Sequence, residues 1–342
     1  MDGTDDMDDA GLSRDACAGF WAQVAADQDA LARMDSMELM EHLNAMLEPL
    51  VDGVAMEVSG ERGGQRELVL TAHGSLERFA AVQALAAQAP ALAGFSVTPF
   101  RRRTSGDFGM RMDGFELSTG DVLVQHGPEA GQVALQVGFA KEIPADMWDH
   151  ARNMAFIMLD HMLGEYDFAV KVGPVDFVES SQLSSPAALH EFAPLLDACW
   201  AGELGHAGGF PAGAHEWTGL EVESESTGEE LLVLRNDSAN ALVGRADLTW
   251  RITVALPVPT REALDVVREY EDRLSGLLEP AQAGICSHVV LDNHVRHMTW
   301  YVGDADAATR QAEQLLAQMQ LQPEALQRGY DPSWQDYLQW AD

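Results

Sequence analysis

The chain has 342 residues, of which 46% are hydrophobic and 22% are charged, so it is long enough to bury a substantial core and to form two domains. Its 55 acidic and 21 basic residues give a formal net charge of -34, which repels nucleic acid and anionic membranes and favours either a basic partner or plain solubility. Three scattered cysteines make no disulfide framework, and no apolar run approaches the ~18 residues of a membrane span, so we expect a reduced, cytoplasmic protein.

The first half of the chain is predicted to form an α+β domain over residues 16–180, preceded by a disordered acidic leader over residues 1–15. Apolar residues at helical spacing predict helices, and alternating apolar residues predict strands. Ser36 and Ser75 are the expected N-caps of two helices. The expected helices are 16–33, 36–50, 75–88 and 144–163, and the expected strands are "VAMEVSG", "RELVLTA", "GFSVTPF", "DVLVQHG", "QVALQVGFA" and "YDFAVKVGPVDFV".

The second half repeats this order of elements. Residues 181–216 are expected to form a helix, "PAALHEFAPLLDACW", and a glycine-rich linker, and residues 217–342 form a second domain. Its predicted elements are strands at 217–224, 230–235, 246–256, 284–291 and 294–302, a helix "TREALDVVREYEDRLSGLL" capped by Thr260, and a helix at 304–320. The pattern predicts an α+β protein of two domains, each a mostly antiparallel sheet with helices on one face, ferredoxin-like in the C-terminal half.

Several stretches after residue 229 carry a resemblance to a bacterial family. They are "LLVLRND", "ADLTWRITVAL", "EYEDRLSGLL", "RHMTWYVGDAD" and "YDPSWQDYLQW", and through them the C-terminal half resembles the DUF695-type domain family. The N-terminal half resembles a group of bacterial proteins through "FWAQVAADQDAL" and "IMLDHMLGEYDFAVKVG". The resemblance implies an α+β fold and supplies no catalytic residues. A more distant analogy of fold and charge is to the RraB-type ribonuclease regulators, which are small and acidic and act by binding an enzyme.

The stretch "ICSHVVLDNHVRHMTWY" places one cysteine and three histidines in a predicted hairpin. A two-residue turn at Asp292-Asn293 sets His288 opposite His297, with Cys286 on the same face. These three side chains would then lie within reach of one soft metal such as zinc. The local sequence offers no fourth ligand, and a shift of register by one residue destroys the cluster. The alternative is an ordinary structural hairpin without a cofactor.

Three aromatic residues near the end of the chain, Trp334, Tyr337 and Trp340, are spaced by three residues. A helical tail would place them on one face. We expect this stripe to pack on the C-terminal sheet; exposed, it would instead be a partner-binding site.

The basic run "FRRRTSG" at 100–106 is interpreted as a solvated loop, with contact to a carboxylate-rich surface as the alternative. His206 and His215 flank the glycine-rich linker, where a solvated histidine is the expected reading and a ligand role the alternative.

The sequence contains no nucleophile elbow, phosphate-binding loop, dinucleotide fingerprint or zincin helix. It therefore predicts a non-catalytic binding or regulatory module that presents an acidic surface to a basic protein partner. One alternative is a metal-binding protein or metal-dependent hydrolase that uses the 285–301 hairpin. Another is an immunity protein against a basic toxin.

Overall fold

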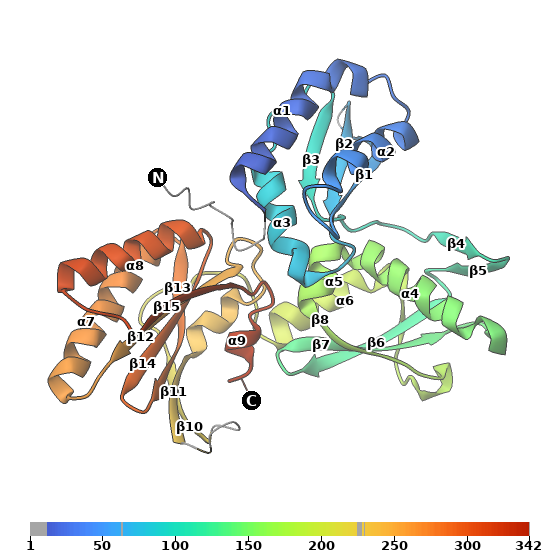
Figure 1. Cartoon of the computed structure of the whole chain (residues 1–342). Coiled ribbons are helices and arrows are strands. Elements are labelled where there is room, and N and C mark those ends of the chain that lie inside the picture. Colours follow the sequence, from blue (N-terminus) through green and yellow to red (C-terminus); the bar gives the residue numbers. More distant parts are fainter. Residues whose placement is uncertain (1–11, 63, 224–227, 229, 342) are drawn as a thin grey trace. The chain divides into compact units, whose positions relative to one another are not determined.

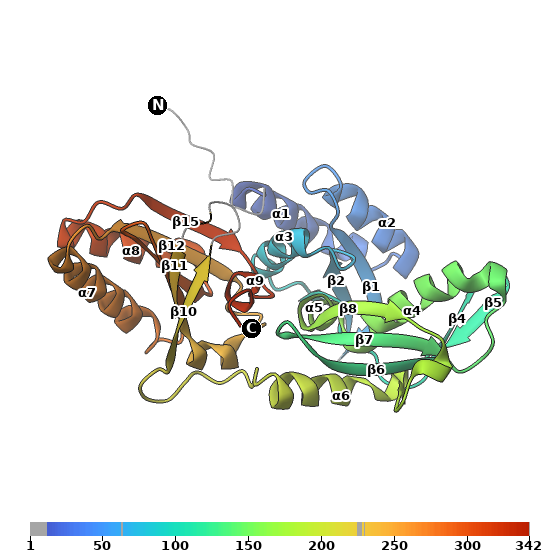
Figure 2. The ribbon, with the colours of Figure 1, turned by 90° about the horizontal axis from the view of Figure 1, so that it is seen from below.

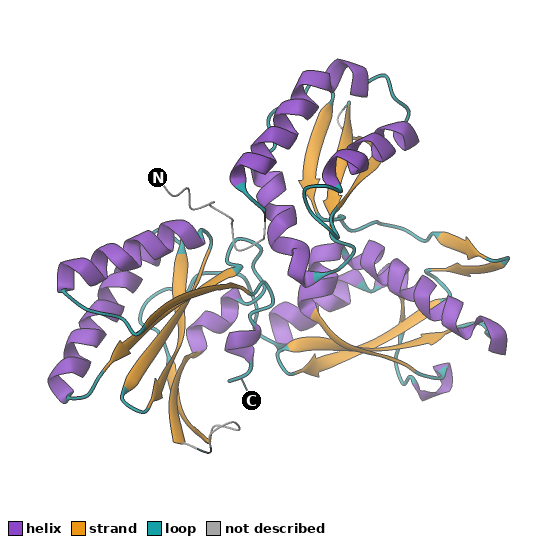
Figure 3. Cartoon of the chain, viewed as in Figure 1, coloured by secondary structure: helices purple, strands orange, loops and turns teal. Residues whose placement is uncertain are grey.

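The computed structural model is a mixed α+β structure with several sheets (Figure 1, Figure 3). It describes residues 12–62, 64–223, 228 and 230–341. The chain divides into two compact units: unit 1 consists of residues 1–126 and 135–195, and unit 2 of residues 127–134 and 196–342. Within the described ranges, no helix is both long and apolar enough to cross a membrane.

The boundary between the units falls inside the segment predicted to be a helix and a linker. Residues 181–195 belong to unit 1, and residues 196–216 belong to unit 2. Residues 1–11 of the predicted leader lie outside the described part of the chain. The first helix starts slightly before its predicted position, because Ser13 accepts a hydrogen bond from the N–H of Ala16 and caps it.

The first sheet of unit 1 contains a parallel pair of strands. Its members are β1 (Ala55–Arg62), β2 (Gln65–Thr71) and β3 (Phe95–Pro99), and its helices are α1 (Arg14–Leu31), α2 (Ser36–Leu47) and α3 (Leu76–Ala87). β1 pairs antiparallel with β2, whereas β2 pairs parallel with β3 because α3 crosses over between them. The expectation of mostly antiparallel pairing did not include this parallel pair of strands. Its consequence is that β2 and β3 both end at the same edge of the sheet.

The rest of unit 1 forms a hairpin and a four-stranded sheet in the order β8-β7-β6-β9. The strands are β4 (Gly109–Met112), β5 (Phe115–Ser118), β6 (Val122–Glu129), β7 (Gln132–Phe139), β8 (Val172–Phe177) and β9 (Ala187–Ala188), and the helices are α4 (Trp148–Leu163), α5 (Glu165–Lys171) and α6 (Ala193–Ala198), the last of which crosses the unit boundary. The predicted strand "YDFAVKVGPVDFV" is wrong in its first half, which is α5. Gly164, at φ 81°, ends α4 and allows a new helix to start at once.

Unit 2 is built on one six-stranded sheet in the order β10-β11-β13-β14-β12-β15, with every neighbouring pair antiparallel. Its strands are β10 (Trp217–Glu223), β11 (Glu230–Asn236), β12 (Trp250–Pro257), β13 (Gly284–Asp292), β14 (Val295–Val302) and β15 (Ala325–Tyr330), and its helices are α7 (Arg261–Leu278), α8 (Ala305–Met319) and α9 (Gln335–Leu338). Helices α7 and α8 lie on the same face of the sheet in both views (Figure 1, Figure 2). The predicted cap is confirmed, because the Thr260 hydroxyl accepts the N–H of Ala263.

The core of unit 2 lies between this sheet and the two long helices. Met298, Trp300 and Val302 of β14 point into it and are fully buried. Since side chains alternate along a strand, Tyr301 points to the opposite face, where it is also buried. That face is covered by the C-terminal tail, so the sheet is buried on both sides rather than on one.

Candidate functional site

A cleft of about 690 Å³ lies in unit 1 beside the ends of the parallel strands. Strand β2 runs into the turn His73-Gly74, and β3 runs into Arg101; all three residues line the cleft. In sheets with parallel strands, ligands bind in the crevice outside the carboxyl ends of the strands. The topology therefore marks this edge as the candidate binding site of unit 1.

Arg101 lies at the centre of the charged groups that line the cleft. Its guanidinium donates two hydrogen bonds to Glu57, from Nε at 2.9 Å and from Nη2 at 2.8 Å, and a third from Nη1 to Asp160 at 2.7 Å. Nη2 also lies 2.7 Å from Nδ1 of His73, which must accept because an arginine can only donate. The neutral His73 ring therefore carries its proton on Nε2.

Burial and the neighbouring charges act in opposite directions on the pKa of Arg101 and on the pKa of Asp160. It lowers the pKa of Arg101, but the hydrogen bond and charge of Glu57, with the charges of Asp160 and Glu165, outweigh it and leave the pKa well above the usual range. Burial raises the pKa of Asp160, and the nearby guanidinium opposes this effect only in part. The cluster is thus an acidic site with one permanently charged cation.

Glu165 fixes the two loops that form the cleft. Its side chain is fully buried at the first position of α5. Its Oε1 accepts the N–H groups of Ala72 at 2.8 Å and Gly74 at 3.1 Å, and its Oε2 accepts the N–H of Arg101 at 3.2 Å. One carboxylate therefore holds the loop after β2 and the loop after β3 in a fixed relation.

The backbone at both strand ends has left-handed conformations. His73 has φ 51° and Phe100 has φ 62°. Each such non-glycine residue costs about 1–3 kcal/mol and persists where the surroundings enforce it, commonly at binding sites. Around Phe100 the surroundings are aromatic, since its ring centroid lies 4.3 Å from that of Phe79 and 5.4 Å from that of Tyr166.

Apolar side chains also line the cleft. Phe156 and Ile157 of α4 line it and remain 40% and 37% exposed. Phe168, Val172 and Val175 of α5 and β8 line it as well. The cleft therefore combines charged groups with exposed apolar side chains.

The basic run at 100–106 supplies the central cation, so its interpretation as a solvated loop is wrong. Besides Arg101, Arg102 pairs with Glu67 at 3.3 Å, and Arg103 pairs with Asp167. The alternative, contact with carboxylates of the protein itself, describes all three arginines. Sequence analysis missed the acidic partners because they are distant along the chain and lie on four other elements.

The predicted metal ligands do not come together, because the hairpin has another register. Its turn is Asn293-His294, at φ 42° and 69°, and not Asp292-Asn293. This shift places His297 opposite Val290 instead of opposite His288.

A β-bulge between Cys286 and His288 separates the other two ligands. Cys286 lies in the core under the helices, and burial raises the pKa of its thiol well above the usual range. His288 is buried on the other face, where its Nε2 lies 3.7 Å from Asp336. The register and the bulge thus place the three predicted ligands apart.

The aromatic stripe of the tail is largely covered. Trp334 and Tyr337 are buried, and Trp340 is half-buried. Trp334 donates from its indole N–H to the carbonyl of Leu248 at 2.8 Å, and the Tyr337 hydroxyl donates to the carbonyl of Asn236 at 3.1 Å. The rings therefore pack within unit 2, as the core alternative expects, and do not form an exposed face for a partner.

The linker histidines are held by specific partners. His206 is buried, and its ring nitrogens lie 2.8 Å and 3.0 Å from the carbonyl oxygens of Asn240 and Gly131. Burial lowers the pKa of His206, against these two carbonyl contacts, which raise it. His215 lies 3.4 Å from Glu279. The expectation of solvated linker histidines is therefore wrong for both.

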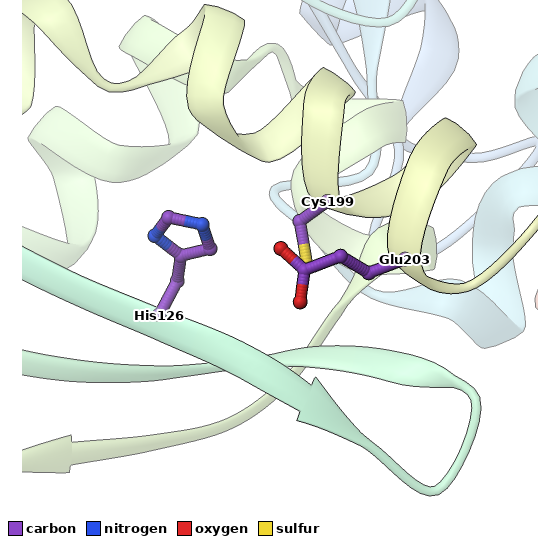
Figure 4. A group of neighbouring side chains, drawn as sticks. All are labelled: His126, Cys199 and Glu203. Carbon is purple, nitrogen blue, oxygen red and sulfur yellow. The ribbon is translucent and has the colours of Figure 1, made fainter.

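A separate group of side chains includes the second cysteine. Cys199 and Glu203 lie in the π-helical turn Cys199–Glu203 of unit 2 (Figure 4). Burial, with the charge of Glu203, raises the pKa of the Cys199 thiol. His126, also drawn in Figure 4, belongs to β6 of unit 1, where its ring meets Phe192 edge-on at 5.3 Å.

Comparison of the chain with protein-family models, with curated proteins and with solved structures finds no match. The resemblance to the DUF695-type family therefore stays a prediction.

Proposed function

We propose that the protein is a non-catalytic binding or regulatory module that presents an acidic surface to a basic protein partner. The observation that carries this proposal is how the chain uses its few cations. Among the side chains that the structure describes, at least twelve Lys and Arg pair with a carboxylate of their own unit. They are Arg78, Arg101, Arg102, Arg103, Lys141, Lys171, Arg235, Arg245, Arg251, Arg273, Arg296 and Arg328.

Most of the few positive charges are thus paired with carboxylates of the protein itself, and the excess of carboxylates remains on the surface. Helix α2 illustrates this locally. Asp35, Glu38, Glu41 and Glu48 are exposed along the helix and its ends, and the helix itself contains neither Lys nor Arg. Such a field accelerates encounter with a positively charged protein and weakens as salt screens it.

The test is a pull-down from native lysate with nuclease treatment, at low and at high salt, read by mass spectrometry. We expect a stoichiometric basic protein that is lost at high salt and that binds again, with the same salt dependence, after both proteins are purified. Absence of a partner at both salt concentrations, or a partner that is acidic and insensitive to salt, would contradict the proposal. Capture of a basic toxin would assign the module as an immunity protein.

We also infer that unit 2 has a ferredoxin-like arrangement. The chain order β12-α7-β13-β14-α8-β15, with the spatial order β13-β14-β12-β15, supports it. Strands β10 and β11 extend the sheet beyond β13. This fold hosts many functions, so the proposed activity rests on charge and not on topology.

A further inference from the structure

Building on the proposed function, we propose that the cleft at the ends of β2 and β3 takes up a lysine or arginine side chain of the basic protein partner. The cleft combines charged groups, exposed apolar side chains and a volume of about 690 Å³. That volume is in the range of pockets that enclose a ligand group, about 300–1,000 Å³. The two kinds of lining group together specify the chemistry of the occupant.

The charged groups select a cation. Two carboxylates that line the cleft, Glu57 and Asp160, contact the single guanidinium of Arg101, and the buried carboxylate of Glu165 lies close enough to add its charge. Glu57 and Asp160 both bond Arg101, so two carboxylates share one cation. A second cation beside Glu57 and Asp160 would therefore be stabilised by charge that the protein leaves unbalanced.

The same groups disfavour an anion, although they include an arginine. Of the five N–H donors of Arg101, the one on Nε and both on Nη2 are used by Glu57 and His73, and one on Nη1 is used by Asp160. A phosphate or carboxylate could bond Arg101 through more than one N–H only by displacing these partners, and it would meet the negative charge of Glu57 and Asp160. Arg101 is thus a structural cation that orients the carboxylates.

The apolar side chains select a cation carried on a hydrocarbon stem. Phe156 and Ile157 of α4 line the cleft and are partly exposed, and Phe168 of α5 also lines it. Lysine and arginine pack their methylene groups on apolar surface while the charged head reaches polar groups. A stem laid on Phe156 and Ile157 would bring the head to Glu57 and Asp160, and an aromatic ring nearby adds favourable cation–π contact.

The test compares two variants that add the same charge at different places, I157K and L277K. Ile157 lines the cleft, whereas Leu277 lies on α7 of unit 2 and is 52% exposed. Both substitutions replace an exposed side chain within a helix, so both proteins should unfold at nearly the same temperature as the wild type. The added ammonium at position 157 reaches the carboxylates of the cleft and competes with the ligand there.

Calorimetric titration of pentalysine into the wild type should show binding that I157K weakens by about tenfold, whereas L277K weakens it by less than about twofold. Equal affinities of I157K and L277K would overturn the assignment to the cleft but would leave the acidic binding module intact. No binding of pentalysine to the wild type would also overturn it, whatever the pull-down recovers.

A second pair of variants tests the carboxylates. E57Q removes a charge from the cleft, and E313Q removes one from the exposed surface of α8. E57Q should weaken pentalysine at least about fivefold more than E313Q does. Spermidine, titrated in parallel, identifies the source of the cation. Tighter binding of spermidine than of pentalysine, with the same loss in I157K, would overturn the assignment to a protein side chain.

Discussion

The indole ring of Trp334 lies flat against the phenol ring of Tyr301, with ring centroids 3.9 Å apart and ring planes 9° apart. The Tyr301 hydroxyl donates to Asp331 at 2.5 Å, and Asp331 in turn accepts the N–H of Gln335 at 2.9 Å. Stacking and hydrogen bonds thus attach the tail to the sheet face opposite α7 and α8. The tail is therefore part of the folded core of unit 2.

Replacing this indole should destabilise unit 2. W334L removes a fully buried ring and leaves the Leu248 carbonyl without its donor. We expect a loss of about 3–4 kcal/mol in the free energy of unfolding. The matched control is W217L at the start of β10, where the ring is 40% exposed and the cost should stay below about 1 kcal/mol. Urea unfolding followed by circular dichroism measures both, and equal losses would contradict the role of the tail.

The stability of unit 2 should fall on acidification because of His288. Burial lowers its pKa to about 4, with Asp336 opposing this effect and Arg251 adding to it. The unfolded chain, with a histidine pKa of about 6.5, then binds more protons than the folded chain below that pH. The contribution is complete above about pH 6.5 and is lost progressively down to about pH 4, by roughly 3 kcal/mol.

Unfolding curves at several pH values measure this slope. H288Q should reduce the loss between these two pH values, even if its stability at neutral pH is lower. The slope should not vanish, because the pKa of His206 is lowered in the same direction. An unchanged slope in H288Q would mean that His288 is not the group responsible.

E165Q should loosen the two loops of the cleft. An amide has one acceptor oxygen, whereas Glu165 uses both oxygens to accept three backbone N–H groups. The side-chain NH2 group that E165Q introduces would face one of these N–H donors, at a cost of about 2–3 kcal/mol in the stability of unit 1. Hydrogen exchange at the amides of Ala72 and Gly74 should accelerate, while E313Q, which changes the same charge on α8, should leave it unchanged.

G131A should disturb the hairpin between β6 and β7. Gly131 has φ 74°, and an added Cβ would collide with the side chain of Leu338. We expect a loss of about 1–2 kcal/mol. Gly127 on the same hairpin is the control, since its conformation is ordinary and a Cβ there meets no atom within 4 Å. If G127A were as destabilising as G131A, the close approach to Leu338 would not be the cause.

Periodicity is sufficient to predict many elements but not their register. Of the predicted caps, Thr260 is confirmed, whereas Asp35 and not Ser36 caps α2, and Ser75 makes no side-chain hydrogen bond at the start of α3. The helix after Thr260 begins as predicted, because a threonine side chain caps a helix through purely local contacts. The hairpin turn was misplaced by one position because Asn293 and His294 both adopt positive φ, which residue type alone does not indicate for histidine. The bulge after Cys286 lies in the pairing of β13 with β14, and the alternation of residue types does not indicate it.

The cleft was beyond prediction for a related reason. Its polar groups, Glu57, His73, Arg101 and Asp160, come from different elements of unit 1, and the parallel pairing of β2 with β3 decides which of them meet. The run of three arginines was the available signal.

Because of the tip of the β6–β7 hairpin, the two units cannot be produced separately by cutting the chain at a single position. The segment Gly127–Ala134 belongs to unit 2, although the chain on both sides of it belongs to unit 1. In this segment, the carbonyl oxygen of Gly131 lies 3.0 Å from Nε2 of His206, and the side chain of Leu338 packs directly against Gly131. A fragment cut at residue 196 would lack this piece, so neither unit can be expressed intact by dividing the gene at one point.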